Sequence, residues 1–211
     1  MTTWSYDQRG RVVSETRRIY SDTASTQAEA FTTQWSYNSA DLPVTTTYPD
    51  GETLAIEYDR QGKPLTMANT NAFTYVRDVL YDEAGRMTHL ELGDTGSEAV
   101  IQRNYSYYPW DQSVQGGRMS SLTGSSIYAS KTSLQSLAYT YDAAGRPTQI
   151  SDEQADETST FSYDGLDRLT GMSVLNDLSE TVHSEVFTYD EVGRMSAKVA
   201  DVQSLSAFTY D

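Results

Sequence analysis

The chain has 211 residues, no cysteine, and a formal net charge of −15 from 15 Lys and Arg against 30 Asp and Glu. Without cysteine it has neither a disulfide framework nor a thiolate metal site. The acidic excess argues against nucleic-acid or anionic-membrane partners, because those surfaces require basic patches. No apolar run is long enough to span a bilayer, and the opening TTWSYDQRG contains no signal-peptide hydrophobic region. We therefore expect no membrane insertion by this segment.

The phrase Tyr-Asp-x-x-Gly-Arg recurs along the whole sequence. In chain order its copies begin at Tyr6, Tyr37, Tyr58, Tyr81, Tyr107, Tyr141, Tyr163, Tyr189 and Tyr210. The copies at Tyr37 and Tyr163 are degenerate, the one at Tyr107 is stretched, and the one at Tyr210 is truncated. The intervals run from 21 to 34 residues, so loops of variable length join the units. Self-similarity of this kind indicates a repeat architecture.

Each repeat tyrosine ends a stretch in which large and polar residues alternate, as they do in a half-buried strand. The residues two positions upstream are all aromatic or β-branched: Trp4, Trp35, Ile56, Val79, Tyr105, Tyr139, Phe161, Phe187 and Phe208. The residue in between is polar in eight of the nine copies. Such alternation predicts a β-strand with one buried face. Helical periodicity is essentially absent, although AEAFTTQ near Ala28 is compatible with a turn or two of helix.

The Asp-x-x-Gly that follows each tyrosine has the chemistry of a tight turn. Asp can accept a hydrogen bond from the backbone two residues on, and Gly can adopt the positive φ that returns the chain as a hairpin. Where glycine is missing, Asp41 or Asp167 replaces it, and Asp tolerates the left-handed region. The repeat signature comprises Tyr6, Asp7, Gly10, Tyr58, Asp59, Gly62, Tyr81, Asp82, Gly85, Arg86, Tyr141, Asp142, Gly145, Arg146, Tyr163, Asp164, Arg168, Tyr189, Asp190, Gly193 and Arg194.

The units together predict an all-β chain of tandem antiparallel β-hairpins in one long twisted sheet. We expect residues 1–211 to form a single repeat array of about eight hairpin units plus a truncated ninth. Terminal units of repeat arrays are normally capped by atypical sequence, and neither end has such a cap. The chain is therefore expected to be a segment of a longer protein, with the remainder of that protein as its partner.

These residues resemble the RHS/YD repeat, whose phrase is aromatic-x-Tyr-Asp-x-x-Gly-Arg, over essentially the whole chain. The resemblance implies hairpins lined up side by side in a strongly twisted sheet that spirals into a hollow shell. Members of the family include shell components of bacterial insecticidal toxin complexes, the polymorphic Rhs toxins, wall-associated bacterial proteins and the YD shell of teneurins. The toxin members also have an Asp-Pro-x-Gly-Leu phrase for self-cleavage, and this sequence contains none.

The resemblance implies two alternative functions, both extracellular. The first is a structural segment of a secreted shell that encloses and protects a toxin polypeptide before delivery. The alternative is a recognition or adhesion scaffold, teneurin-like or wall-associated, with a cell-surface glycan as candidate ligand. We expect no enzymatic activity and no cofactor, because no nucleophile–base pair or metal-ligand spacing is visible.

Four further features have a structural and a functional interpretation. The repeat tyrosines are expected to stack on their equivalents in neighbouring hairpins, the alternative being a ligand-facing aromatic surface. Asp82 and Arg86 are expected to pair with each other or with the next turn along. His89 and His183 lie in different repeats and are expected to be isolated strand residues. The acidic stretch SDEQADE from Ser151 lacks the spacing of a calcium loop and is expected to be solvated.

The stretched copy YYPWDQSVQGGRM is the exception among the turns. Gly117 lies ten residues after Tyr107, against four in an ordinary copy, so six residues are inserted. Long loops on rigid repeats are a common place for function, which makes Tyr108, Pro109 and Trp110 a candidate contact loop. The alternatives are that Trp110 folds back over an edge or contacts an adjoining domain.

Overall fold

The computed structural model describes residues 1–20, 28–71, 73–94, 100–112, 114–126 and 132–201, together with the backbone of 204–207. The described residues form strands, turns and loops only, and none of them belongs to a helix that could span a membrane. The truncated copy at Tyr210 lies outside the described residues.

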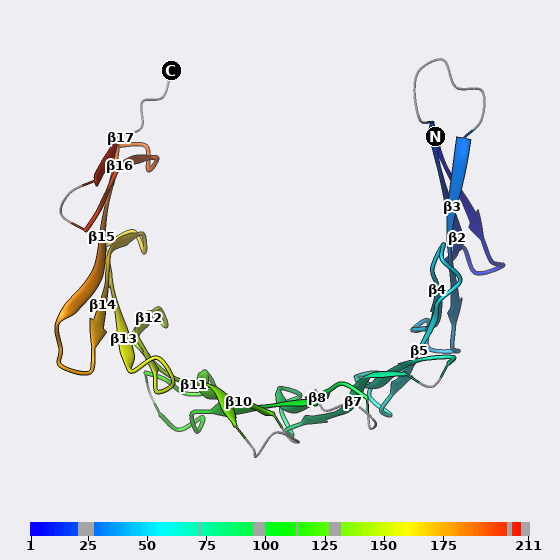
Figure 1. Cartoon of the computed structure of the whole chain (residues 1–211), viewed down its shortest axis with the longest axis horizontal. Coiled ribbons are helices and arrows are strands. Elements are labelled where there is room, and N and C mark those ends of the chain that lie inside the picture. Colours follow the sequence, from blue (N-terminus) through cyan, green and yellow to red (C-terminus); the bar gives the residue numbers. More distant parts are fainter. Residues whose placement is uncertain are drawn as a thin grey trace. The chain divides into compact units, whose positions relative to one another are not determined.

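The chain runs through seventeen strands. They are β1 (Thr2–Tyr6), β2 (Val12–Tyr20), β3 (Ala28–Tyr37), β4 (Pro43–Thr47), β5 (Thr53–Tyr58), β6 (Pro64–Asn69), β7 (Thr74–Tyr81), β8 (Met87–Leu92), β9 (Ile101–Tyr107), β10 (Met119–Ser126), β11 (Ser133–Tyr141), β12 (Pro147–Asp152), β13 (Glu157–Tyr163), β14 (Leu169–Asn176), β15 (Thr181–Tyr189), β16 (Met195–Ala200) and β17 (Ser204–Ala207). Every repeat tyrosine among the described residues is the last residue of a strand, as the alternation predicts, and Figure 1 labels the strands in chain order.

Strands that follow one another in sequence pair antiparallel, and all belong to one 17-stranded sheet. The prediction of an all-β chain of tandem hairpins is therefore confirmed. The alternative of a helical turn near Ala28 is wrong, because Ala28–Tyr37 is the strand β3 and pairs with both β2 and β4. Two strand partners satisfy the backbone of this segment better than an isolated turn or two of helix would.

The chain divides into two compact units, Met1–Gln102 and Arg103–Asp211. The first unit contains the repeat turns that begin at Asp7, Asn38, Asp59 and Asp82. The second contains those that begin at Tyr108, Asp142, Asp164 and Asp190. Both units thus consist of the same kind of hairpin, and a single array over residues 1–211 stays a prediction.

The repeat turns have the backbone geometry that the sequence predicts. The amide of Asp142 donates to the carbonyl of Arg146 at 3.0 Å, and the amide of Gly145 donates to the carbonyl of Asp142 at 2.9 Å. Gly145 has a φ of +85°. This is a type I turn followed by a left-handed residue, a common three-residue hairpin loop. Asp41 and Asp167 adopt φ values of 65° and 64° in place of glycine, which confirms their predicted role.

A β-bulge follows each repeat turn on the return strand. Tyr141 pairs with Pro147 and Thr140 with Gln149, so one residue, Thr148, has no partner in the ladder. The same shift next to the tyrosine occurs in the hairpins that end at Tyr6, Tyr37, Tyr58, Tyr81, Tyr163 and Tyr189. Bulges increase local twist and change which face a following side chain occupies. Each hairpin therefore has a built-in twist at its turn end.

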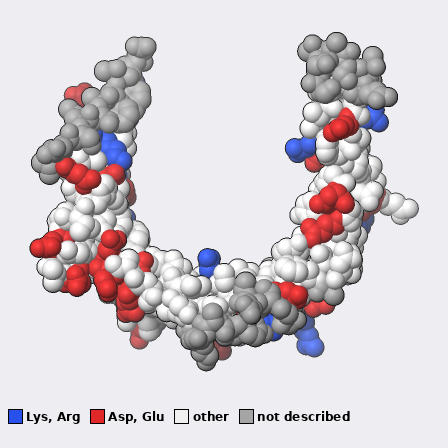
Figure 2. Space-filling view, in the orientation of Figure 1, with Lys and Arg blue, Asp and Glu red and all other residues white. Residues whose placement is uncertain are grey.

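The sheet has little buried core. Among the described residues, Val79 at 3% exposure and Val100 at 0% are the buried apolar side chains. Most other strand residues are half-buried, because neighbouring hairpins cover them from the side. Figure 2 shows acidic side chains gathered over the region of β12 to β14, in line with the net charge of −15. Neighbouring hairpins must therefore be held together more by contacts within the sheet than by a packed core.

Candidate functional site

In the turns where an arginine begins the return strand after an Asp-x-x-Gly or Asp-x-x-Asp phrase, one carboxylate holds both the backbone and that arginine. In the first turn, Asp7 Oδ1 accepts hydrogen bonds from the backbone amides of Arg9 at 2.8 Å and Arg11 at 3.0 Å. Asp7 Oδ2 accepts from Arg11 Nε at 2.6 Å. The Oδ2–Nε contact recurs at 2.6–2.8 Å in the pairs Asp82–Arg86, Asp142–Arg146, Asp164–Arg168 and Asp190–Arg194. The predicted pairing of Asp and Arg within one turn is confirmed.

The turn ion pairs shift the carboxyl pKa values. Side-chain and backbone hydrogen bonds from Arg146 lower the pKa of Asp142, and backbone and side-chain hydrogen bonds from Arg168 lower the pKa of Asp164 against the opposing effect of burial. A carboxyl group with a lowered folded-state pKa contributes stability above its unfolded pKa, about 3.9 for Asp, and loses that contribution as the pH falls. The turns therefore resist mild acid and weaken in strong acid.

The repeat tyrosines connect each repeat to the preceding one through their hydroxyl groups. The hydroxyl of Tyr163 donates to the carbonyl of Pro147, the residue directly after Arg146, at 2.8 Å. The same bond, at 2.7–2.9 Å, joins Tyr37 to Val12, Tyr58 to Pro43, Tyr81 to Pro64, Tyr141 to Met119 and Tyr189 to Leu169. The acceptor is always the first residue of the preceding return strand. Its carbonyl satisfies a hydroxyl that burial against that strand would otherwise leave unpaired.

The cation of the preceding repeat covers the tyrosine ring. The guanidinium carbon of Arg146 lies 4.7 Å from the ring centroid of Tyr163. Cations lie at 4.5–5.7 Å in the pairs Arg11–Tyr37, Lys63–Tyr81, Arg118–Tyr141 and Arg168–Tyr189. The prediction that equivalent tyrosines stack on one another is wrong, because each of these tyrosine rings contacts a cation of the preceding repeat instead. We refer to the tyrosine hydroxyl bond and the covering cation together as the inter-repeat contact.

In two of the turns, at Gly85 and Gly145, the glycine also makes room for the inter-repeat contact. A Cβ at Gly145 would overlap the guanidinium of Arg118 from the preceding repeat. A Cβ at Gly85 would lie 2.9 Å from Lys63 Nζ. Glycine is therefore required twice, for its positive φ and for the cation that passes over it.

Aspartate in the glycine position forms a different contact with the preceding repeat. Asp41 Oδ1 lies 2.6 Å from Arg11 Nη1, and Asp167 Oδ1 lies 2.8 Å from Arg146 Nη1. In the degenerate turns, the Asp side chain thus takes the place that glycine leaves empty and forms an ion pair with the arginine of the preceding repeat. The sequence indicated that Asp is tolerated there but not that it binds the neighbouring arginine.

The stretched turn keeps the backbone frame of an ordinary one. The amide of Tyr108 donates to the carbonyl of Arg118 at 2.8 Å, and the amide of Gly117 donates to the carbonyl of Tyr108 at 3.0 Å. Tyr108 thus occupies the place of Asp, and its hydroxyl donates to the carbonyl of Tyr139 at 2.7 Å, toward the following repeat. The guanidinium of Arg118 donates to the carbonyl of Val114 instead of a carboxylate.

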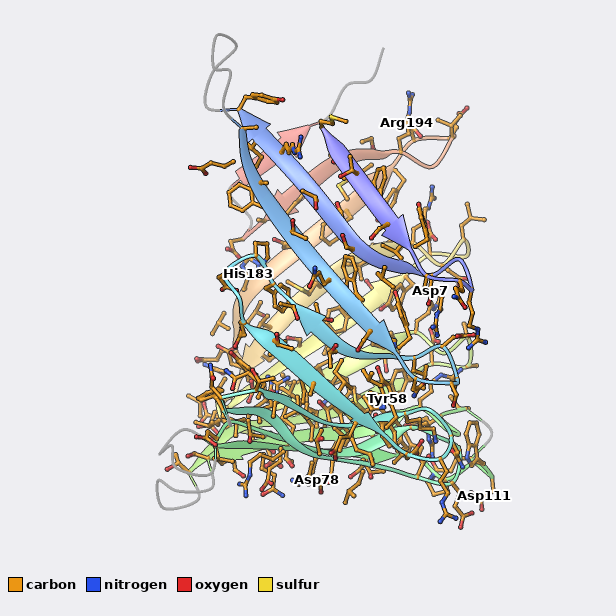
Figure 3. The ribbon with its side chains drawn as sticks, turned by 90° about the vertical axis from the view of Figure 1, so that its right-hand side faces the viewer. Asp7, Tyr58, Asp78, Asp111, His183 and Arg194 are labelled. Carbon is orange, nitrogen blue, oxygen red and sulfur yellow. The ribbon has the colours of Figure 1, made fainter. Side chains whose placement is uncertain are left out.

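Trp110 lies at the tip of the stretched turn and is 68% exposed. Its ring covers Gly117, where a Cβ would overlap it. Trp110 thus folds over the glycine of its own turn, and the predictions that it covers a sheet edge, contacts an adjoining domain or forms a contact loop with Tyr108 and Pro109 stay predictions. Asp111, labelled in Figure 3, lies beside it at the same end of the hairpin.

His183 is not the isolated residue that the sequence predicted. Its Nδ1 lies 2.9 Å from Asp201 and its Nε2 lies 3.4 Å from Glu185, which Lys198 also contacts at 2.6 Å. The hydrogen bond to Asp201 raises the pKa of His183. The contact is therefore strongest below the unfolded pKa of about 6.5 and weakens as the pH rises through the folded value. Figure 3 places His183 at the end of the hairpins opposite to Arg194.

The acidic stretch from Ser151 forms the turn between β12 and β13. Asp152 Oδ1 accepts hydrogen bonds from the backbone amides of Gln154 and Ala155, and Asp156 adopts a φ of 53°. The carboxylate thus shapes the turn. Within the part of the chain that the structure describes, no group of three His, Cys, Asp or Glu side chains is arranged to hold a metal ion.

Residues 141–174 match the family model of the RHS repeat. This segment contains the ordinary turn at Asp142, the degenerate turn at Asp164 and the inter-repeat contact between Arg146 and Tyr163. This segment of the chain therefore contains an RHS repeat. No curated protein matches it in sequence.

Solved structures share the fold of this chain. It is similar to the crystal structure of TcdB2-TccC3, with a TM-score of 0.77 and 18% identity, over 97% of this chain and 12% of that one. The crystal structure of TcdB2-TccC3-Cdc42 gives a TM-score of 0.76 at the same identity and coverage. The Tc holotoxin pore of Photorhabdus luminescens, with a TccC3 mutation, gives 0.73 at 17% identity, over 94% of this chain and 11% of that one. The chain therefore spans about an eighth of the length of the chains that it resembles.

Proposed function

We propose that this chain is a non-enzymatic structural segment of a secreted RHS/YD-repeat shell that encloses and protects a toxin polypeptide before delivery. The observation that carries the proposal is the fold shared with TcdB2-TccC3 over 97% of this chain. Its partners are then the remainder of the shell protein and the enclosed toxin. The shared fold extends over only 12% of the TcdB2-TccC3 chain, in keeping with a segment of a larger wall.

The inter-repeat contacts suit a shell wall. A wall one sheet thick has no second layer to stabilise it, and the buried apolar side chains described here are few. Hairpins are instead fixed to the preceding ones by hydroxyl bonds and, in most of the described repeats, also by a covering cation, as in the contact of Tyr163 with Pro147 and Arg146. Repeated nearest-neighbour contacts of this kind can extend a sheet over many hairpins.

The test uses the full-length gene product in which this chain occurs. Cryo-electron microscopy is expected to show a closed shell with weak density for polypeptide inside it. Limited proteolysis should leave the enclosed segment intact until the shell is opened with denaturant. An open sheet, or a C-terminal segment that protease removes from the native protein, would contradict encapsulation.

A second candidate function, adhesion to a cell-surface glycan, is favoured by the exposed ring of Trp110. An exposed aromatic ring is a common platform for sugars, because it combines apolar area with little loss of conformational freedom. A glycan array with the chain and Trp110→Ala tests this function, with Trp4→Ala as the matched control for an exposed tryptophan in the same array of hairpins. Specific binding that only Trp110→Ala abolishes would favour adhesion.

A further inference from the structure

A groove with aromatic walls lies on the first unit, at the end of the hairpins opposite to the repeat turns. It encloses about 720 Å³ between β3, the β4–β5 turn, β6 and β7. Its walls include Phe31, Tyr48, Met67 and Tyr75. A volume of this size falls within the range of small-ligand pockets, roughly 300–1,000 Å³. The sequence motifs did not indicate this groove, because its residues lie outside the repeat phrase.

The β4–β5 turn holds the polar groups of the groove in fixed positions. The amide of Tyr48 donates to the carbonyl of Glu52 at 2.8 Å, and the amide of Gly51 donates to the carbonyl of Tyr48 at 2.9 Å. The amide of Glu52 donates to Asp50 Oδ1 at 3.0 Å. This is the same turn geometry as in the repeat phrase, with tyrosine in the place of Asp. It brings one ring and two carboxylates to the groove from five consecutive residues.

Glu52 is the central charge of the groove. Its Oε1 accepts hydrogen bonds from the hydroxyl of Tyr75 at 2.5 Å and from the side-chain amide of Asn69 at 3.0 Å. The bond to Glu52 raises the pKa of Tyr75, so the tyrosine hydroxyl keeps its proton. The side-chain amide of Asn69 is neutral as well. The two neutral donors orient the carboxylate without neutralising it. None of the residues that line the groove is basic.

A negative, aromatic groove has a clear electrostatic preference. The faces of tyrosine and phenylalanine rings attract cations, and so do the carboxylates of Glu52 and Asp50. An anion would be repelled, and a neutral sugar would gain nothing from the uncompensated charge. Phe73 packs edge-on against Tyr75 with the ring centroids 4.9 Å apart, which fixes that wall.

We propose that this groove binds an organic cation, an alkylammonium or guanidinium group, with its charge against Glu52 and its alkyl part between Tyr48, Phe31 and Tyr75. Such a group occurs both in free amines and in the Lys and Arg side chains of an extended polypeptide. The inference does not depend on the proposed shell function, because it rests only on residues 31–75 of the first unit.

The test is calorimetric titration of the 211-residue chain. Choline represents a free amine, and the N-acetyl methylamides of lysine and arginine represent polypeptide side chains. The matched ligand control is 3,3-dimethylbutan-1-ol (dimethylbutanol), in which a neutral carbon replaces the charged nitrogen of choline. We expect saturable binding of at least one cation at millimolar concentration or below, weaker binding at high salt, and affinity for dimethylbutanol lower by at least about fivefold. The ratio between choline and the amino-acid derivatives identifies the source of the cation.

Glu52→Gln removes the charge while keeping the shape, and it should weaken cation binding by at least about fivefold. Glu83→Gln removes the same charge from an exposed turn of the same unit, outside the groove, and should leave the affinity unchanged. If Glu52→Gln is misfolded by circular dichroism, Tyr48→Leu tests the aromatic wall in its place. Equal affinity for choline and dimethylbutanol, preference for a neutral sugar, absence of saturable binding, or equal effects of Glu52→Gln and Glu83→Gln would each overturn the inference.

Discussion

The ordinary turn at Asp142–Arg146 and the stretched turn at Tyr108–Arg118 close their hairpins with the same two backbone hydrogen bonds. They differ in the side chain at the first position. Asp142 binds the side chain of Arg146, whose guanidinium then lies 4.7 Å from the next tyrosine ring. Tyr108 offers no carboxylate, and Arg118 binds a carbonyl of its own loop and lies 5.7 Å from the next ring.

The difference separates two tasks that the repeat phrase combines. The glycine and the backbone frame close the hairpin, and they do so even when six residues are inserted. The aspartate adds a second task, which is to aim the arginine at the following repeat. Hairpin closure and contact between repeats can therefore be perturbed separately.

The largest effect is expected from the glycine that serves both tasks. Gly145→Ala forces a residue with a Cβ into a φ of +85° and against the guanidinium of Arg118. We expect the free energy of unfolding to fall by about 2 kcal/mol, from the left-handed conformation and the overlap. Urea unfolding followed by fluorescence measures the loss. Gly165→Ala is the control, because a Cβ there meets no atom within 4 Å, and an equal loss in both variants would refute this account.

A smaller effect is expected from the hydroxyl bond between repeats. Tyr163→Phe removes the bond to the carbonyl of Pro147 and should reduce the free energy of unfolding by about 1 kcal/mol. Tyr108→Phe removes a different hydroxyl bond, from the Asp position of the stretched turn to Tyr139 in the following repeat, and should cost about the same. Tyr6→Phe is the control, since Tyr6 is 59% exposed and its hydroxyl bonds to no residue that the structure describes. A loss in Tyr6→Phe as large as in Tyr163→Phe would show that the bond is not the cause.

A smaller effect again is expected from the charge of the turn carboxylate. Asp142→Asn keeps an acceptor for the backbone amides but removes the ion pair with Arg146. We expect a modest drop in the urea midpoint and greater mobility of Arg146, measured by NMR relaxation of its Nε. Arg118 should show that mobility already in the unmodified protein. Equal order of Arg118 and Arg146 before substitution would contradict a role of Asp142 in aiming the cation.

The smallest difference is expected in the response to acid. Because hydrogen bonds from Arg146 lower the pKa of Asp142, the ordinary turn keeps its contribution down to the unfolded pKa of about 3.9 and loses it as the pH falls further. The stretched turn has a tyrosine in that place and should not respond. An acid titration followed by the amide shifts of Gly145 and Gly117 compares the two turns. Parallel titration of both amides would mean that another group is responsible.

Much of the fold could be predicted from the repeat phrase. Alternation upstream of Tyr141 and turn chemistry at Asp142 and Gly145 are local properties, so the sequence alone predicts a strand, a turn and a return strand. The bulge at Thr148 is not visible in the alternation, because nothing in the residue types marks the extra residue. The side-by-side order of the hairpins follows from their short connections.

The contacts between repeats could be predicted only in part. Pairing of Asp142 with Arg146 follows from their positions across one turn. The contact of Arg146 with Tyr163 does not, because intervals of variable length leave the register between repeats open. The groove at Glu52 was missed for a related reason. Its aromatic and acidic residues are separate in sequence and converge only when the five strands β3 to β7 lie side by side.

The backbone frame of the stretched turn has a practical consequence. Eight residues can stand between Tyr108 and Gly117 without moving the strands on either side, where an ordinary repeat has two. The corresponding position in every other hairpin turn is thus a suitable site for inserting residues. A peptide tag, a recognition epitope or a protease site grafted between Asp142 and Gly145 would be displayed at a known position, the tip of a hairpin.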